Sequence, residues 1–170
     1  MEKTKSIVKS LVEKKLMGNI FLGYCYICGD ILHKGHREHL RNCKTICEKG
    51  NALLVVGVLS DKAIVERKPH PALPYHERFD AVKPYADIIV CQDEYSPLKN
   101  CMALRPSVLF ESTSHKDFPA NNFMKSIGGQ VLILPYYSEE SSSRLKKIIK
   151  EKTKNEDIKN NDSKPNNSVS

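Results

Sequence analysis

The sequence has no long hydrophobic run. None of its apolar stretches approaches the roughly 18 residues that a membrane-spanning helix needs. Its N-terminus, MEKTKSIVKSLVEKKLMGN, interleaves lysines with apolar residues and lacks the hydrophobic segment of a signal peptide. These absences predict a cytoplasmic protein without a membrane partner, and 170 residues suffice for one domain with a single core.

Features of nucleic-acid-binding modules are scarce as well. Tryptophan is absent, and no Arg-rich helix or aromatic stacking platform stands out. The formal net charge is nevertheless +7, and the last twenty residues contribute none of it. The charges that cancel there are Lys152, Lys154, Lys159 and Lys164 against Glu151, Glu156, Asp157 and Asp162. The basic body predicts an anionic partner, and we expect a phosphorylated small molecule rather than nucleic acid.

Export features are missing too, so the six cysteines are expected to be reduced thiols. Cys25 and Cys28 precede His33 and His36, which makes a zinc site or a thioredoxin-like redox pair alternatives. In a strand, however, Cys25 and Cys28 point to opposite faces. The pair also lies late in a strand rather than at a helix start. We therefore predict neither a redox pair nor a protein-bound metal.

Hydrophobic periodicity alternates between that of strands and that of helices. Strands are expected at 19–28, 52–58, 87–91, 107–112 and 130–136. Helices are expected at 3–16, through Leu40, Cys43 and Cys47 up to Gly50, and at 60–67, 75–83, 97–105, 121–129 and 141–153. This alternation predicts an α/β fold: a Rossmann-like, doubly wound, parallel five-stranded sheet in a single domain.

Three segments are predicted along the chain. Residues 1–19 form an N-terminal helix, and residues 20–153 form the main domain. Residues 154–170 are polar and Asn-rich, which is typical of a disordered tail.

The stretch GDILHKGHREHL, residues 29–40, connects the first predicted core strand to the first core helix. Ligands of doubly wound sheets bind beyond the carboxyl ends of the strands. His33 and His36 are three apart near a helix start, so they are expected to be neighbours at the helix's positive end. This placement favours phosphate binding, whereas taken alone the two histidines are also compatible with surface residues without a role.

The same stretch resembles the Asp-x-x-His-x-Gly-His signature of the cytidylyltransferase-like nucleotidyltransferases. Further segments resemble that family in the same order, over roughly residues 20 to 150. They are LLVVGVLSDKAI, ERKPHPALPYHERF, EYSPLKNCMALRPSVLF and IGGQVLILPYYSEESSSRLKKI. The His-x-Gly-His element is also similar to that of class I tRNA synthetases, but this chain is too short for an anticodon or editing domain.

The resemblance implies transfer of a nucleoside monophosphate, CMP from CTP as the first choice, with release of pyrophosphate. The acceptor is expected to be a small phosphorylated alcohol, a sugar phosphate or a phosphonate, with Mg²⁺ as cofactor and a homodimer as the assembly. Two alternatives stay open: an adenylyltransferase of the heptose-phosphate type that uses ATP, and a non-catalytic nucleotide-binding module.

The resemblance also assigns candidate site residues. The catalytic ones are His33, His36 and Lys68, and the nucleotide-binding ones are Cys28, Gly29, Asp30, Gly35, Arg78, Ser141, Ser142 and Ser143. Of the two histidines, His36 is expected to contact the transition state. For Lys68 the alternative is a solvated lysine, and for the serines it is ordinary helix capping. Arg78 is expected either to bind a phosphate or to pair with Glu77 or Asp80.

Three positions depart from the family pattern. Gly29 replaces an aromatic residue before the signature Asp, and Glu111 and Ser112 replace a Lys-Gly pair after the fourth strand. Glu139 and Glu140 precede the serine run, where small residues are usual. The changes at 111 and 112 concern acceptor recognition, and the two glutamates suggest the binding-module alternative.

Overall fold

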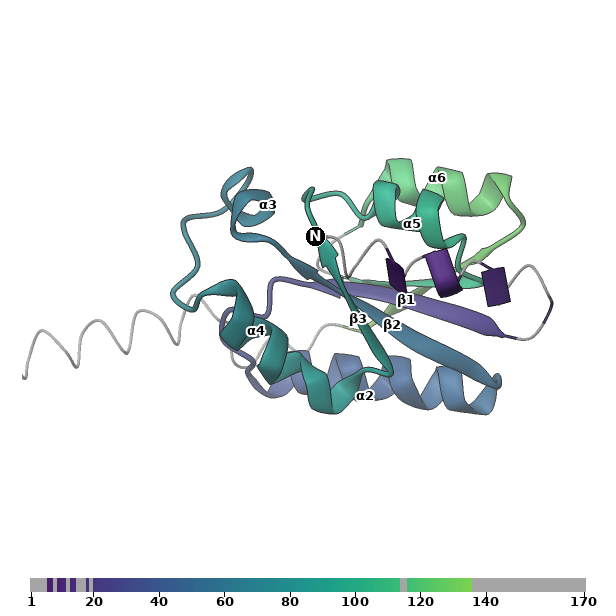
Figure 1. The fold of residues 1–170 in the computed structure, drawn as a ribbon, viewed down its shortest axis with the longest axis horizontal. Helices are drawn as coiled ribbons and strands as arrows, with labels where there is room; N and C mark the ends of the chain where they lie inside the picture. Colours follow the sequence, from purple (N-terminus) through teal and green to yellow (C-terminus); the bar gives the residue numbers. More distant parts are fainter. Residues whose placement is uncertain are drawn as a thin grey trace, which may run out of the picture.

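The computed structural model describes residues 6, 7, 9–11, 13, 14, 18, 20–113 and 116–135. Five parallel strands form one sheet in the order β3-β2-β1-β4-β5 (Figure 1). They are β1 (Phe21–Ile27), β2 (Ala52–Leu59), β3 (Ile88–Gln92), β4 (Val108–Ser112) and β5 (Gln130–Leu134). All five predicted strands are therefore present, and the parallel sheet is confirmed.

Helices cover both faces of this sheet. The helical elements are α2 (Lys34–Lys49), α3 (Asp61–Val65), α4 (Tyr75–Val82), the 3₁₀ turn η1 (Lys83–Tyr85), α5 (Leu98–Leu104) and α6 (Phe118–Ser126). Figure 1 shows α2 and α4 on one face and α5 and α6 on the other, which confirms the doubly wound fold. Strand order reverses between β1 and β4, which is where a crevice for a ligand is expected in such sheets.

Strand β1 is buried on both faces because it lies at the centre of the sheet. Its side chains alternate: Leu22 and Tyr24 belong to the core cluster under α5 and α6, and Cys25 belongs to the cluster under α2. Buried residues on both faces explain the continuous apolar runs seen in the sequence. Cys25 is fully buried and acts here as a small core residue.

The described residues between 6 and 14 are helical, in agreement with the helix predicted at 3–16. Leu11 from this segment is buried in the same cluster as Leu22 and Met124. The predicted helix at 141–153 and the predicted tail at 154–170 lie outside the described residues. Of the helices in the described part, none is long and apolar enough to cross a membrane.

Candidate active site

The two signature histidines begin helix α2 at the carboxyl end of β1. His33 is the N-cap residue, is 2% exposed, and accepts a hydrogen bond at Nδ1 from the Gly35 amide at 3.1 Å. His36 lies in the first turn and bonds through Nδ1 to the Ile31 carbonyl oxygen at 3.1 Å. The two rings stack with their centroids 3.8 Å apart. The predicted adjacency of the histidines at the helix start is confirmed.

The environment of His36 keeps its imidazole neutral near pH 7. Burial, followed by the neighbouring His33 and Lys68, lowers the pKa of His36 to about 4. A carbonyl oxygen can only accept, so Nδ1 carries the proton of the neutral ring. The unprotonated Nε2 is therefore the atom available to a ligand. A polyanion bound beside it raises the pKa again, which makes Nε2 a donor.

The start of α2 suits a phosphate group. The helix is 16 residues long and carries no acidic residue in its first turn, so its positive end is not neutralised. Gly35, the second residue of the helix, is buried and adds no side chain between the backbone and a ligand. This position is compatible with the expected nucleotide-binding role of Gly35.

Lys68 lies at the same crevice, although it comes from the segment after α3. Its ammonium nitrogen is 3.7 Å from the Cys28 sulfur, and its charge contributes to the lowered pKa of His36. The side chain is exposed, so the cation stays mobile and hydrated. The structure thus brings together His33, His36, Lys68 and Cys28, four of the predicted site residues.

Asp30 and Gly29 shape the loop between β1 and α2. Asp30 is buried and accepts a hydrogen bond at Oδ1 from the Leu73 amide at 2.9 Å, which fastens the loop before α4 to the crevice. Gly29 has φ +72°, a conformation that glycine adopts without strain. The departure from an aromatic residue at this position is explained by that turn.

Arg78 is fully buried and holds the crevice together. Its Nε donates to the Leu73 carbonyl at 3.1 Å, and its Nη1 donates to the Cys28 and Leu59 carbonyls at 2.5 and 2.7 Å. Its Nη2 forms an ion pair with Asp61. The predicted pairing with Glu77 or Asp80 is wrong, because α4 turns the guanidinium inward. Two roles were predicted for Arg78, phosphate binding and structural pairing, and its contacts in the structure are structural.

Glu111 also has a structural position. It is buried and accepts hydrogen bonds from the Asp117 amide at 3.0 Å and from the Tyr26 hydroxyl at 3.3 Å. Burial raises the pKa of this carboxyl group, against the effect of these donors. Asp117 in turn caps α6 by accepting from the Ala120 amide at 2.9 Å. Helix α6 therefore begins at Phe118 rather than at the predicted residue 121.

Two residues near Lys68 were not among the candidate site residues, although they lie in the segments ERKPHPALPYHERF and EYSPLKNCMALRPSVLF that resemble the family. Tyr95 lies against Ala63 and Ile64, and Arg67 stacks over its ring. Neither residue is singled out by periodicity or by spacing. The available signal was their place in those two segments, with Arg67 directly before Lys68.

Several predicted residues lie outside the described part of the chain. They are Ser141, Ser142 and Ser143, together with Glu139 and Glu140. Their roles at the triphosphate stay predictions.

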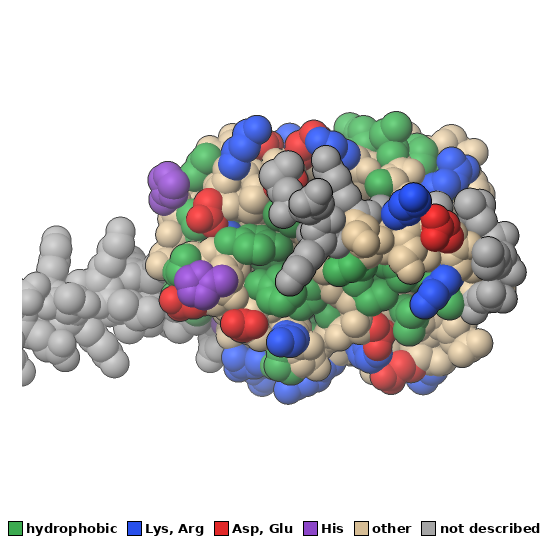
Figure 2. Space-filling view, viewed as in Figure 1, with side chains coloured by type: hydrophobic (Ala, Val, Ile, Leu, Met, Phe, Trp, Pro, Cys, Tyr) green, Lys and Arg blue, Asp and Glu red, His purple; other side chains and the backbone are tan. Residues whose placement is uncertain are grey.

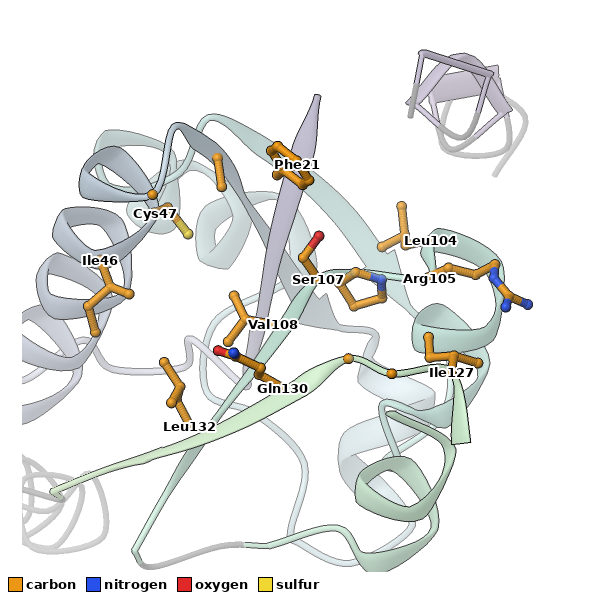
Figure 3. Close-up of a pocket in the computed structure, with 15 residues that line it drawn as sticks. Phe21, Ile46, Cys47, Leu104, Arg105, Ser107, Val108, Ile127, Gln130 and Leu132 are labelled. Carbon is orange, nitrogen blue, oxygen red and sulfur yellow. The ribbon is translucent and has the colours of Figure 1, made fainter. Parts of the chain in front are cut away.

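A hollow of about 790 Å³ lies at the opposite, amino end of the strands (Figure 3). Phe21, Val108 and Leu132 line it from the sheet, and Ile46 lines it from α2. None of the signature residues is among its lining residues, and its side chains are mostly apolar. Among the described residues that line it, the hollow has one cation, Arg105, and no histidine or lysine, so we place the candidate site at the carboxyl end, where the signature histidines and Lys68 meet.

Comparisons with known proteins give relatives that match most of this chain. The chain is 28% identical to the "Bifunctional protein HldE" of Caulobacter sp. strain K31 over 131 residues, which are 73% of this chain and 26% of that protein. It is 34% identical to the "Ethanolamine-phosphate cytidylyltransferase" of Arabidopsis thaliana over 77 residues, 44% of this chain and 17% of that protein. The matched part thus spans about a quarter of the first relative. No protein-family model matches the chain.

Among solved structures, the lipopolysaccharide core biosynthesis protein of Thermoplasma volcanium GSS1 superposes with a TM-score of 0.57 at 20% identity. The match covers 69% of this chain and 97% of that one. At this identity the likeness concerns the fold alone, and it supports the Rossmann-like architecture.

Proposed function

The chain belongs to the cytidylyltransferase-like nucleotidyltransferases, and from this premise we propose that it transfers CMP from CTP to a small phosphorylated acceptor, with release of pyrophosphate. The acceptor is an alcohol phosphate, a sugar phosphate or a phosphonate. The observation that carries the proposal is the stacked pair of His33 and His36 at the start of α2, with Lys68 at the same crevice.

In the proposed reaction, an acceptor oxygen attacks the α-phosphorus of the nucleotide. The bond from that phosphorus to the oxygen bridging the α- and β-phosphates breaks, and pyrophosphate leaves with the electron pair. Negative charge builds on the non-bridging α-oxygens, so catalysis depends on placed donors and cations. No covalent intermediate with the protein is needed.

The histidines have different parts in this scheme. His36 is oriented by its bond to Ile31, so its Nε2 is free to take a proton when the triphosphate binds and to donate to an α-oxygen. His33 uses Nδ1 to hold the Gly35 amide and packs against the His36 ring. His33 therefore fixes the geometry of the loop and the position of the His36 ring. Lys68 supplies a mobile positive charge.

We propose that Mg²⁺ enters with the nucleotide. The groups at the crevice are imidazole and ammonium nitrogens, which suit phosphate oxygens, whereas Mg²⁺ prefers oxygen ligands. Triphosphate oxygens and water would hold the ion, and its charge would offset that of the departing pyrophosphate. We also propose a homodimer, as the family resemblance implies.

CTP is proposed ahead of ATP. The relative from Arabidopsis thaliana is named a cytidylyltransferase, and this name supports CTP as the nucleotide of the proposed reaction. The relatives named HldE keep the heptose-phosphate type with ATP as the alternative. The nucleotide requirement separates the two.

The test is pyrophosphate release with each common ribonucleoside triphosphate and a panel of glycerol, heptose, choline, ethanolamine and phosphonate acceptors. We expect turnover with CTP and one acceptor class, and a drop of about 100- to 1000-fold in His36→Ala, the usual cost of one placed donor. His76→Ala is the control, because that side chain is 76% exposed on α4. Nucleotide binding without turnover in any combination would establish the binding-module alternative instead.

A further inference from the structure

Two consecutive basic side chains gather over one aromatic ring at the rim of the crevice. The Arg67 guanidinium carbon is 4.9 Å from the Tyr95 ring centroid, and the Lys68 ammonium nitrogen is 5.9 Å from it. The amides of both basic residues donate to the Ile64 carbonyl, at 3.2 and 2.9 Å, in the turn that ends α3. One hydrogen-bonded turn therefore holds the backbone of both residues beside Tyr95.

Tyr95 is a rigid platform for these cations. Its ring is 8% exposed and packs in a cluster with Leu59, Ala63 and Ile64. Its amide donates to the Glu66 carboxylate at 3.1 Å, and its carbonyl accepts from the Gln92 side chain at 3.1 Å. The loop after β3 is thus fastened both to the end of β3 and to the segment after α3.

The acidic side chains of these segments have other partners. Glu66 accepts from the Tyr95 amide, Asp61 pairs with Arg78, and Glu94 pairs with Lys99 at 3.2 Å. No ion pair in the described part of the chain includes Arg67 or Lys68. Arg67 and Lys68 therefore place two positive charges side by side at the rim. An anionic ligand could neutralise both charges and accept hydrogen bonds from both side chains.

Lys68 links this rim to the signature histidines. The Lys68 ammonium group is 3.7 Å from the sulfur of Cys28, which directly precedes the signature, and its charge acts on His36. A phosphate held by Arg67 and Lys68 would thus lie on the β2–β3 side of His36. The start of α2 would take the triphosphate.

From these contacts we infer that Arg67, stacked on Tyr95 and beside Lys68, binds the phosphate or phosphonate group of the acceptor. The inference rests on the proposed function, and it names the group of the acceptor that this chain recognises: a dianionic phosphorus oxyanion. The planar guanidinium can donate two parallel hydrogen bonds to such a group, which lysine cannot. Arg67 is a residue of acceptor specificity.

The first test measures pyrophosphate release with the acceptor that turns over. Arg67→Gln should raise KM for the acceptor about tenfold or more, with a far smaller change in KM for the nucleotide, because one charged contact to the acceptor is lost. Arg67→Glu should raise it further. Arg41→Gln is the matched control: this arginine also lies over a tyrosine ring, 5.6 Å from that of Tyr85, but on α2. An unchanged acceptor KM in a folded Arg67→Gln variant would overturn the inference.

A second test does not depend on turnover. Inorganic phosphate at millimolar concentration is titrated into the full chain without nucleotide, and the Arg67 side-chain Nε–H signal is followed by NMR. We expect this signal to shift, and the Arg41 signal to stay in place. An unmoved Arg67 signal would overturn the inference, whether or not the protein is active. Absence of turnover together with a shifted Arg67 signal would count against the proposed function alone.

Discussion

The two ends of the parallel strands differ in what they bury. At the carboxyl end, Asp30, His33 and Arg78 are buried polar residues whose contacts join four separate segments. At the amino end, a hollow of about 790 Å³ is lined mainly by apolar side chains such as Phe21 and Leu132 (Figure 3). Burying polar groups costs free energy unless they are bonded. Their concentration at one end therefore locates the chemistry better than the size of a hollow does.

The outer surface adds little to that distinction. On the face in Figure 2, acidic and basic side chains are interspersed, and hydrophobic side chains gather across the middle. The basic residues on which the proposal depends are Arg67 and Lys68, which lie over the Tyr95 ring.

The largest effect on stability and activity is expected when the carboxyl end of the sheet loses the hydrogen bonds of Arg78. Arg78→Met removes the donor for the carbonyls of Cys28, Leu59 and Leu73, all at the crevice. Unfolding free energy, measured with urea, should fall by about 3 to 5 kcal/mol, as for breaking a buried charged network, and turnover should be lost. Arg41→Met on α2 is the control. A loss below about 1 kcal/mol would mean that the crevice does not depend on this clamp.

The next effect concerns pH. Because folding lowers the pKa of His36 from 6.5 to about 4, the unfolded chain binds more protons between these values. Stability from this residue is present above pH 6.5 and is lost as pH falls toward about 4. The full effect is on the order of 3 kcal/mol.

The measurement is urea unfolding of the wild type and of His36→Gln at about pH 4.5 and about pH 7.5. The wild type should lose more stability on acidification than the variant, since glutamine does not titrate. Equal losses in the two proteins would contradict the lowered pKa of His36.

The smallest effect is expected at the amino end. Phe21 lines the hollow and is 55% exposed, so Phe21→Ser should cost about 1 kcal/mol or less and should leave kcat and KM unchanged. Calorimetric unfolding and pyrophosphate release check the two parts. If turnover fell while the fold stayed intact, the two ends of the sheet would be coupled, and the comparison drawn above would be wrong.

Much of the fold could be predicted from the sequence because periodicity is a local property. The five strands, the helix that begins at the signature and the approach of His36 to His33 all follow from runs of a few residues. The sequence also contains a signal for the start of α6. Asp117 followed by Pro119 is the combination of a capping residue and a first-turn proline.

Side-chain partners across loops could not be predicted in this way. Arg78 pairs with Asp61, 17 residues away, rather than with its helical neighbours, because burial turns it inward. Tyr95 meets Arg67 only because the ends of β2 and β3 lie side by side. Such contacts arise when distant segments fold together, and no local pattern records them.

The span of the Arg78 contacts has a consequence for the order in which the protein folds. Its guanidinium joins carbonyls 50 and 19 residues away in the chain, so these bonds form only after β1 and β2 have paired and α4 has docked. The crevice is thus a late product of folding. Conversely, detachment of α4 would break these bonds even if the sheet stayed paired, and a protein in that state would lack the assembled crevice.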